Sequence, residues 1–119
     1  MAKLSKALAD RKVNILAIHA STDETRNQVH LVVDNLSAAK TALGAEGLTY
    51  TETEVAQVAL PNRPGELARV AARLGEAKIN INYAYSGNDP GTNAPLLFFG
   101  VAEAARAAKV LDQAATAAA

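Results

Sequence analysis

A stretch near the middle of the chain combines residue types that could bind a small anion. It reads Leu60-Pro61-Asn62-Arg63-Pro64-Gly65-Glu66-Leu67. Pro64 disfavours helical dihedral angles in Arg63, so a helix that follows begins no earlier than Pro64. Gly65 allows another backbone or a ligand to come close to the first helical turn. Because the first amide groups of a helix lie at the positive end of its dipole, this turn could bind a carboxylate.

The same loop also has a purely structural interpretation. Asn62 could cap the helix through its side chain or bind a ligand. The whole segment could equally be a turn that only starts the helix. The residues of the loop therefore leave two interpretations open, a ligand-binding loop and a structural turn.

Two histidines are a second candidate for chemistry. His19 and His30 fall on neighbouring predicted strands, where they could approach each other and bind a metal ion or respond to pH. Two ligands alone make a poor metal site, and we therefore expect none. The glycines Gly87 and Gly91 resemble those of a phosphate loop, but no lysine and helix follow them, so a hairpin turn is the better interpretation.

The residue patterns of common catalytic sites are missing from the sequence. It has no cysteine and no Gly-x-Ser-x-Gly motif, and no pair of carboxylates flanks a recognisable cleft. We therefore expect a protein that is not an enzyme and that needs no cofactor. Nucleic acid is also disfavoured as a partner, because 12 acidic residues balance 12 basic ones and Phe98 and Phe99 lack basic neighbours.

The composition is typical of a soluble globular protein. The chain has 119 residues, of which 50% are hydrophobic and 20% charged, enough to bury a core without disulfides. The absence of cysteine fits a reducing compartment, and Met1–Arg11 lacks the continuous apolar run of a signal peptide. No stretch is long and apolar enough to span a membrane. These features predict a cytoplasmic protein without a membrane partner.

The candidate loop lies in the second half of an internal repeat. Val13-Asn14-Ile15 corresponds to Ile79-Asn80-Ile81, 66 positions further on, and Leu31–Leu43 corresponds to Phe99–Leu111 at an offset of 68. The two extra residues fall in the loop Ser86–Ala94 of the second copy. Self-similarity of this kind is typical of two copies of one supersecondary unit.

Each copy shows the same order of periodicities. An amphipathic helix comes first, with apolar residues three and four positions apart: Leu4, Ala7 and Leu8 in one copy, and Leu67, Val70, Ala71 and Leu74 in the other. Two predicted strands and a second helix follow, at Val13–Ala20, Val29–Val33 and Leu36–Leu43, and again at Ile79–Tyr85, Leu96–Val101 and Glu103–Ala114. The β-prone stretch Leu48–Leu60 joins the copies and would supply a strand to each.

The predicted order is βαββαβ in each copy, with pieces missing at both ends of the chain. The first copy has no counterpart of Glu54–Glu66, so it lacks an opening strand and its loop. The second copy ends in Gln113–Ala119, where a closing strand would be expected. The sequence thus predicts a first repeat over residues 1–53 and a second over residues 54–119.

A predicted strand is followed by the loop NRPGEL, a helix and the strand INI, all within a duplicated βαββαβ pattern. This arrangement resembles the ACT domain family, and in particular small proteins of tandem ACT domains. The resemblance covers nearly the whole chain. It implies an α+β fold of two ferredoxin-like repeats whose sheets associate side by side. It also implies a regulatory protein that binds a free amino acid in the crevice between the strand-to-helix loop of one domain and the second strand of a neighbour.

Carried over by position, the resemblance implies nine ligand-binding residues. They are Asn62, Arg63, Gly65, Glu66, Leu67, Asn80, Ile81, Asn82 and Tyr83. The first copy has counterparts only on the strand, at Asn14, Ile15 and Leu16, and its glycine loop is absent. We therefore expect one competent site per chain.

Two expectations concern the partners. Leu67 and Ile81 would form apolar walls and Tyr83 an aromatic one, with Arg63 pointing to solvent, which favours an apolar or aromatic amino acid. The missing opening strand leaves Leu48–Thr53 without its usual neighbour, and an open sheet edge favours a homodimer or higher homo-oligomer. The alternative to a sensor is a structural or protein–protein interaction module that binds no small ligand.

Overall fold

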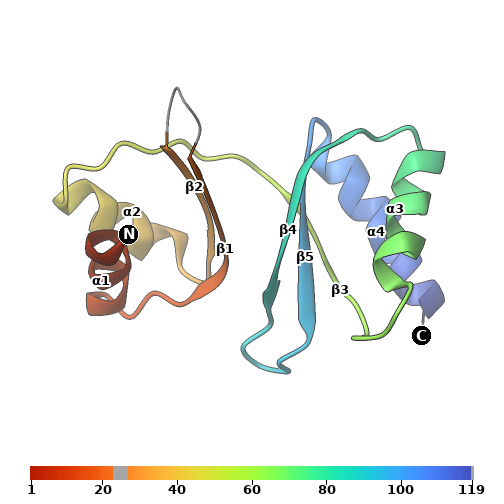
Figure 1. Cartoon of the computed structure of the whole chain (residues 1–119), viewed down its shortest axis with the longest axis horizontal. Coiled ribbons are helices and arrows are strands. Elements are labelled where there is room, and N and C mark those ends of the chain that lie inside the picture. Colours follow the sequence, from red (N-terminus) through yellow and green to blue (C-terminus); the bar gives the residue numbers. More distant parts are fainter. Residues whose placement is uncertain (23–26, 119) are drawn as a thin grey trace. The chain divides into compact units, whose positions relative to one another are not determined.

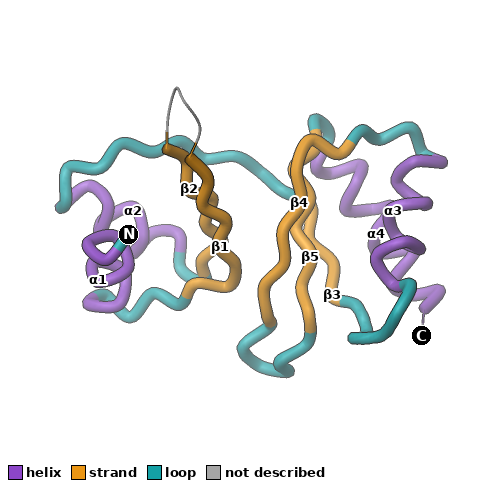
Figure 2. The backbone as a smooth tube through the Cα atoms, viewed as in Figure 1, coloured by secondary structure: helices purple, strands orange, loops and turns teal. Residues whose placement is uncertain are grey.

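The computed structural model describes residues 1–22 and 27–118. Contacts between residues divide the chain into two compact units, unit 1 (Met1–Thr53) and unit 2 (Glu54–Ala119). The division falls at the boundary between the two predicted repeats. Each unit is a mixed α+β structure, and Figures 1 and 2 show its helices and strands.

Unit 1 is a β-hairpin covered on one face by two helices. Its elements are α1 (Ala2–Asp10), β1 (Ile15–Thr22), β2 (Asn27–Val33) and α2 (Leu36–Ala45), and β1 pairs with β2 in antiparallel orientation. The core forms where the two helices meet the hairpin, because Leu31 and Val33 of β2 pack against a buried cluster that includes Leu8 of α1 and Ala39 of α2. Asn35 caps α2 by accepting the amide proton of Ala38 at 3.1 Å.

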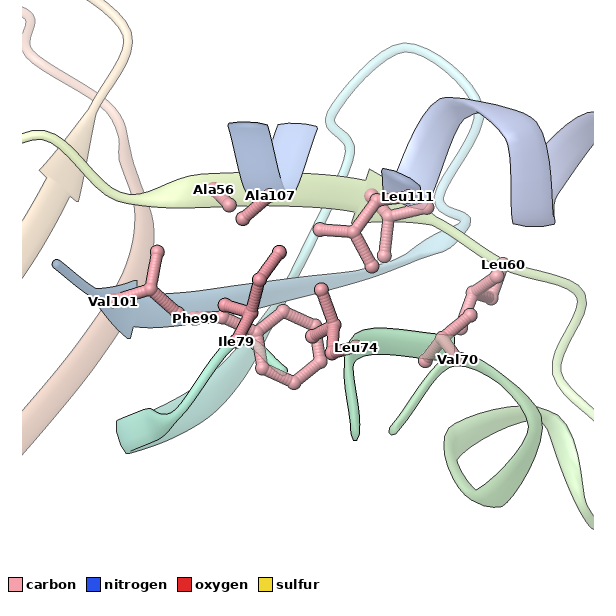
Figure 3. Packing of buried hydrophobic residues seen from close by; sticks show 10 residues of the cluster. Ala56, Leu60, Val70, Leu74, Ile79, Phe99, Val101, Ala107 and Leu111 are labelled. Atoms are coloured by element: carbon pink, nitrogen blue, oxygen red, sulfur yellow. The ribbon is translucent and has the colours of Figure 1, made fainter. Parts of the chain in front are cut away.

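Unit 2 contains the same elements and one additional strand. They are β3 (Ala56–Ala59), α3 (Glu66–Glu76), β4 (Ile81–Asn88), β5 (Pro95–Val101) and α4 (Ala104–Ala118). The central strand β5 pairs antiparallel with β4 on one side and β3 on the other. Figure 3 shows the core between this sheet and the two helices, where Leu74 of α3 and Leu111 of α4 lie close to Phe99 of β5.

The bounds of the elements reproduce the offsets of the internal repeat. A shift of 66 positions places β1 on β4, and a shift of 68 places β2 on β5. Local details agree as well: Lys12 and Lys78 both adopt a left-handed backbone conformation, with φ of 57° and 60°. Both first strands also carry an irregularity at equivalent positions, between Ile15 and Ala17 and between Ile81 and Tyr83.

The prediction of a long extended stretch at Leu48–Leu60 is wrong for its first part. Only Ala56–Ala59 forms a strand, and residues 48–55 have no regular secondary structure. A strand needs a neighbour to satisfy its backbone hydrogen bonds. Among the described residues, no strand pairs with residues 48–55. The β-prone composition of the segment is therefore not sufficient to make it a strand.

Candidate functional site

The loop that connects β3 to α3 is held at both of its ends. At its start, Leu60 is buried and its backbone amide donates to the carbonyl oxygen of Pro95 on β5, at 3.2 Å. At its end, the Arg69 amide donates to the carbonyl oxygen of Gly65 at 3.0 Å and begins the hydrogen bonding of α3. The exposed residues between them are thereby held against the sheet and the first turn of the helix.

Gly65 is required by the backbone conformation of this loop. Its φ is +89°, in the left-handed region that side chains other than glycine rarely adopt. A Cβ placed on Gly65 would have no heavy atom within 4 Å beyond its chain neighbours. Within the described residues the position is therefore open, and its demand for glycine comes from the dihedral angle and not from crowding.

The first turn of α3 has no side-chain cap. Gly65 is the N-cap residue, and among the described residues the start of this helix has no side-chain cap hydrogen bond. One of the two roles considered for Asn62, that of the cap, is thus excluded. Because the first amides of an α-helix have no acceptor within the helix, this turn presents donors to whatever lies beside it.

An ion-pair cluster lies across the start of α3. Arg63 Nε donates to Glu66 Oε1 at 2.8 Å, and Arg69 Nη2 donates to Glu66 Oε2 at 2.9 Å. These hydrogen bonds, from Arg63 first and then Arg69, lower the pKa of the Glu66 carboxyl below its ordinary value. We call Arg63, Glu66 and Arg69 the clamp; its three charges sum to one positive charge beside the helix N-terminus.

The clamp bears on two expectations. Arg63 was expected to point to solvent, and its side chain is 56% exposed while its guanidinium group pairs with Glu66. Glu66 was expected to bind the ligand, and both of its carboxylate oxygens already accept hydrogen bonds from arginines. The residue that the sequence analysis missed is Arg69. Its spacing from Glu66, three positions along a helix, is a detectable signal.

The ligand-binding residues predicted on the strand lie partly at the exposed surface and partly against the core of unit 2. Asn80, just before β4, donates from Nδ2 to Oδ1 of Asn82 at 3.2 Å, and both side chains are exposed. Ile81 packs against the buried core of unit 2 instead. Its partly buried side chain therefore contributes to the stability of the unit.

Tyr83 lies on the face of the sheet that α3 and α4 do not cover. Ile81 pairs with Val101 and Tyr83 pairs with Gly100, so two residues of β4 oppose one of β5 and the alternation shifts at Asn82. A Cβ at Gly100 would overlap the Tyr83 ring, which places the ring directly over that glycine. The prediction that Ile81 and Tyr83 line the same pocket is wrong, because it assumed an unbroken alternation.

Tyr83 belongs to an aromatic row on this face. Its ring stacks on Tyr85 with centroids 6.1 Å apart, and Tyr85 stacks on Phe98 at 5.7 Å. Burial, and secondarily the neighbouring Tyr83, raises the pKa of the Tyr85 hydroxyl. Among the nine predicted residues, the structure thus groups Asn62, Arg63, Gly65, Glu66 and Leu67 at the start of α3 and leaves Ile81 and Tyr83 on opposite faces of β4.

The histidines face each other, as the sequence suggested. His19 and His30 are directly paired on β1 and β2, with ring centroids 6.1 Å apart. Over residues 1–22 and 27–118, no three His, Cys, Asp or Glu side chains are grouped so that they could hold a metal ion. No helix in the same ranges is long and apolar enough to cross a membrane.

Comparisons with known proteins bear on the fold. No protein-family model matches the chain, and no curated protein matches it. Solved structures do match, among them the crystal structure of protein BT0572 from Bacteroides thetaiotaomicron. The two chains are 22% identical, the match covers 94% of this chain and 76% of that one, and the TM-score is 0.81. At this level of identity the similarity shows a shared mixed α+β fold and nothing about activity.

Proposed function

We propose that the chain is a non-catalytic regulatory protein that binds a free amino acid at the start of α3, as its resemblance to the ACT domain family implies. In this proposal unit 1 and unit 2 are two ferredoxin-like repeats. The strand order β4-β5-β3 in unit 2 supports it, because the first strand of a ferredoxin-like unit lies beside the third. The repeated element bounds described above support it as well.

The observation that carries the proposal is the clamp beside an uncapped helix N-terminus. A carboxylate at this turn would meet backbone amide donors and a cluster with one net positive charge. Gly65, with no heavy atom near its Cβ position, leaves space for the approach. In the part of the chain that the structure describes, this loop and the clamp occur in unit 2, so the proposal places the site there.

The ligand's side chain would meet Leu67. This residue is 54% exposed in the first turn of α3, although leucine side chains are usually buried. An apolar or aromatic amino acid would cover it, whereas a second carboxylate or ammonium group would gain nothing from it. The ligand's ammonium group would bind backbone carbonyls or Asn62, since Glu66 is engaged in the clamp. A neighbouring ACT-like domain, as the resemblance implies, would complete the crevice.

The test is a thermal-shift screen of the twenty amino acids, followed by calorimetric titration of those that raise the melting temperature. A ligand at a hundred times its dissociation constant should add about 2.7 kcal/mol to the free energy of unfolding. Leucine, isoleucine, valine, phenylalanine and tyrosine should bind more tightly than aspartate or lysine. A response confined to aspartate or lysine would contradict the proposed contact with Leu67, and a flat panel would favour an interaction module without a small ligand.

Two variants locate the site. Gly65→Asn places a side chain over the first turn, and asparagine tolerates the left-handed conformation, so binding should be lost while the fold remains. Gly75→Ala, near the other end of the same helix, also adds a side chain where no atom lies within 4 Å, and it should bind as the wild type does. Equal affinities of the two variants would place the ligand elsewhere.

A further inference from the structure

The two histidines of unit 1 have no part in the proposed function. They are the only histidines of the chain, which also has no cysteine. His19 of β1 and His30 of β2 lie directly opposite each other in the antiparallel ladder. Directly opposed residues have Cβ atoms about 4.5–5.5 Å apart, and their side chains project from the same face. Both imidazole groups of the chain are therefore at one place on the hairpin.

The internal repeat shows that these two positions bring rings together. At offsets of 66 and 68, His19 and His30 correspond to Tyr85 and Phe98 of unit 2, which are also directly paired and have ring centroids 5.7 Å apart. The histidine rings have centroids 6.1 Å apart. Where unit 2 has an aromatic contact, unit 1 therefore has two imidazoles, and imidazole is the commonest metal ligand among protein side chains.

The separation of the histidine rings suits a shared metal ion. A zinc–nitrogen bond is about 2.0–2.1 Å long, so two imidazoles on one tetrahedral ion have ring centroids about 5 Å apart. Rotation of the side chains can close the remaining difference of about 1 Å, since His19 is exposed and His30 only partly buried. Each ring binds the ion through one nitrogen, and its other nitrogen remains able to hydrogen bond elsewhere. The strands need not move.

We propose that His19 and His30 chelate one divalent transition-metal ion, with water or a small molecule in its remaining positions. The sequence led us to expect no metal here, because two ligands do not enclose an ion. Over residues 1–22 and 27–118 no third His, Cys, Asp or Glu joins the pair, so the ion stays open to solvent and exchangeable. Imidazole suits late first-row ions, and the affinity should rise from Ni²⁺ to Cu²⁺ and fall again at Zn²⁺.

Zinc titration followed by NMR of the imidazole rings tests the proposal on the unmodified protein. With two histidines in the chain, each ring can be assigned and followed. Both sets of ring signals should shift along the same curve and saturate at one zinc ion per chain. Signals that stay unchanged at millimolar zinc, or a shift of one ring alone, would overturn the proposal. Saturation at one ion for two chains would also overturn it, because the ion would then lie between copies.

Calorimetric titration of variants assigns the ligands. His19→Gln and His30→Gln should each weaken zinc binding by about tenfold or more, since even the loss of a partner behind a metal ligand has an effect of that size. Gln28→Ala is the matched control, because Gln28 lies two residues from His30 on the same face of β2 and is not a ligand in the proposal. An equal loss in Gln28→Ala and in the folded histidine variants would overturn the assignment.

The outcome is independent of the proposed amino acid site. Neither histidine belongs to unit 2, and the titrations contain no amino acid. Zinc binding can therefore fail while amino acids still raise the melting temperature, and the reverse result is equally distinguishable. If a histidine variant does not fold, the NMR titration of the wild type still decides the proposal.

Discussion

Units 1 and 2 each have their own core on the face of the strands that the helices cover. The two units differ on the opposite face of the strands. Leu8 and Leu74, at equivalent positions, are both fully buried, and Val13 and Ile79 are each 7% exposed. On the opposite face, unit 1 pairs His19 with His30 where unit 2 pairs Tyr85 with Phe98. The comparison teaches that packing of helices on strands constrains one face in both units, whereas the other face takes polar or aromatic pairs.

The cross-strand pairs on that second face compensate in size. In unit 1 the small Ala17 opposes Val32, whereas in unit 2 the large Tyr83 opposes Gly100. Side chains directly opposite each other on antiparallel strands are in contact, so a gain of volume on one strand requires a loss on the other. The two residues of such a cross-strand pair therefore differ together between the units: a small residue faces a larger one in each pair, but on opposite strands.

The largest expected difference between the units is the loss of stability when the residue paired with β3, or its equivalent in unit 1, is replaced by alanine. Phe99→Ala removes a side chain that is 1% exposed and should lower the free energy of unfolding of unit 2 by about 3–5 kcal/mol. The equivalent Leu31→Ala acts on a side chain that is only partly buried and should cost less than about 2 kcal/mol. Hydrogen exchange of the amides of each unit, measured across a urea series, gives both losses of unfolding free energy. Equal losses would show that β3 does not account for the difference in burial.

The size compensation predicts a double-mutant cycle. Gly100→Val should destabilise unit 2 by about 1–3 kcal/mol, because the new side chain meets the Tyr83 ring. Adding Tyr83→Ala reproduces the small-and-large pair of unit 1 and should recover about 1 kcal/mol or more. Denaturant unfolding of the wild type, both single variants and the double variant gives the coupling energy. Strict additivity would mean that the two positions do not compensate.

Glycines in the two units should respond to alanine with opposite sign. Gly65→Ala forces a side chain into the left-handed region and should cost about 1–2 kcal/mol. Gly44 lies inside α2 of unit 1, with no atom within 4 Å of its Cβ position, so Gly44→Ala should stabilise by up to about 1 kcal/mol. Chemical denaturation of both variants checks the signs. A stabilising Gly65→Ala would show that the loop has a different conformation in solution.

The smallest effect is the pH dependence that the clamp adds to unit 2. The first turn of α1 in unit 1 contains no acidic residue. The hydrogen bonds of Arg63 and Arg69 lower the pKa of Glu66 in the folded state, so its stabilising effect is complete above the ordinary pKa that this carboxyl has in the unfolded state. It is lost as the pH falls through the folded-state pKa. The melting temperature of the wild type should therefore exceed that of Glu66→Gln at neutral pH and approach it in acid.

Glu76→Gln is the matched control for this pH dependence. Glu76 is the last residue of α3 and lies outside the clamp. The difference between its melting temperature and that of the wild type should not change through the same acid range. A Glu66→Gln difference that stayed constant from neutral pH into acid would show that the ion pairs contribute nothing in solution.

Sequence reasoning located the loop and the helix of the candidate site but not their partners. Pro64 and Gly65 mark the start of α3 by local rules, and the structure begins the helix at Glu66. Tyr83 was assigned to the wrong face because a single extra residue, Asn82, reverses the alternation. Arg69 was overlooked because its contact with Glu66 becomes apparent only after the helix is placed. Whether the loop binds an amino acid stays a prediction.

The sequence by itself determined the order of the elements and their repetition at offsets of 66 and 68, because apolar periodicity, prolines and glycines act within a few residues of each other. Only the tertiary structure decided which of those segments pair. Leu48–Val55 has the composition of a strand and lacks regular structure, while Ala56–Ala59 is a strand because β5 lies beside it. The physical reason is that a strand's hydrogen bonds are made with a neighbour that may be distant in sequence, whereas a helix satisfies its own.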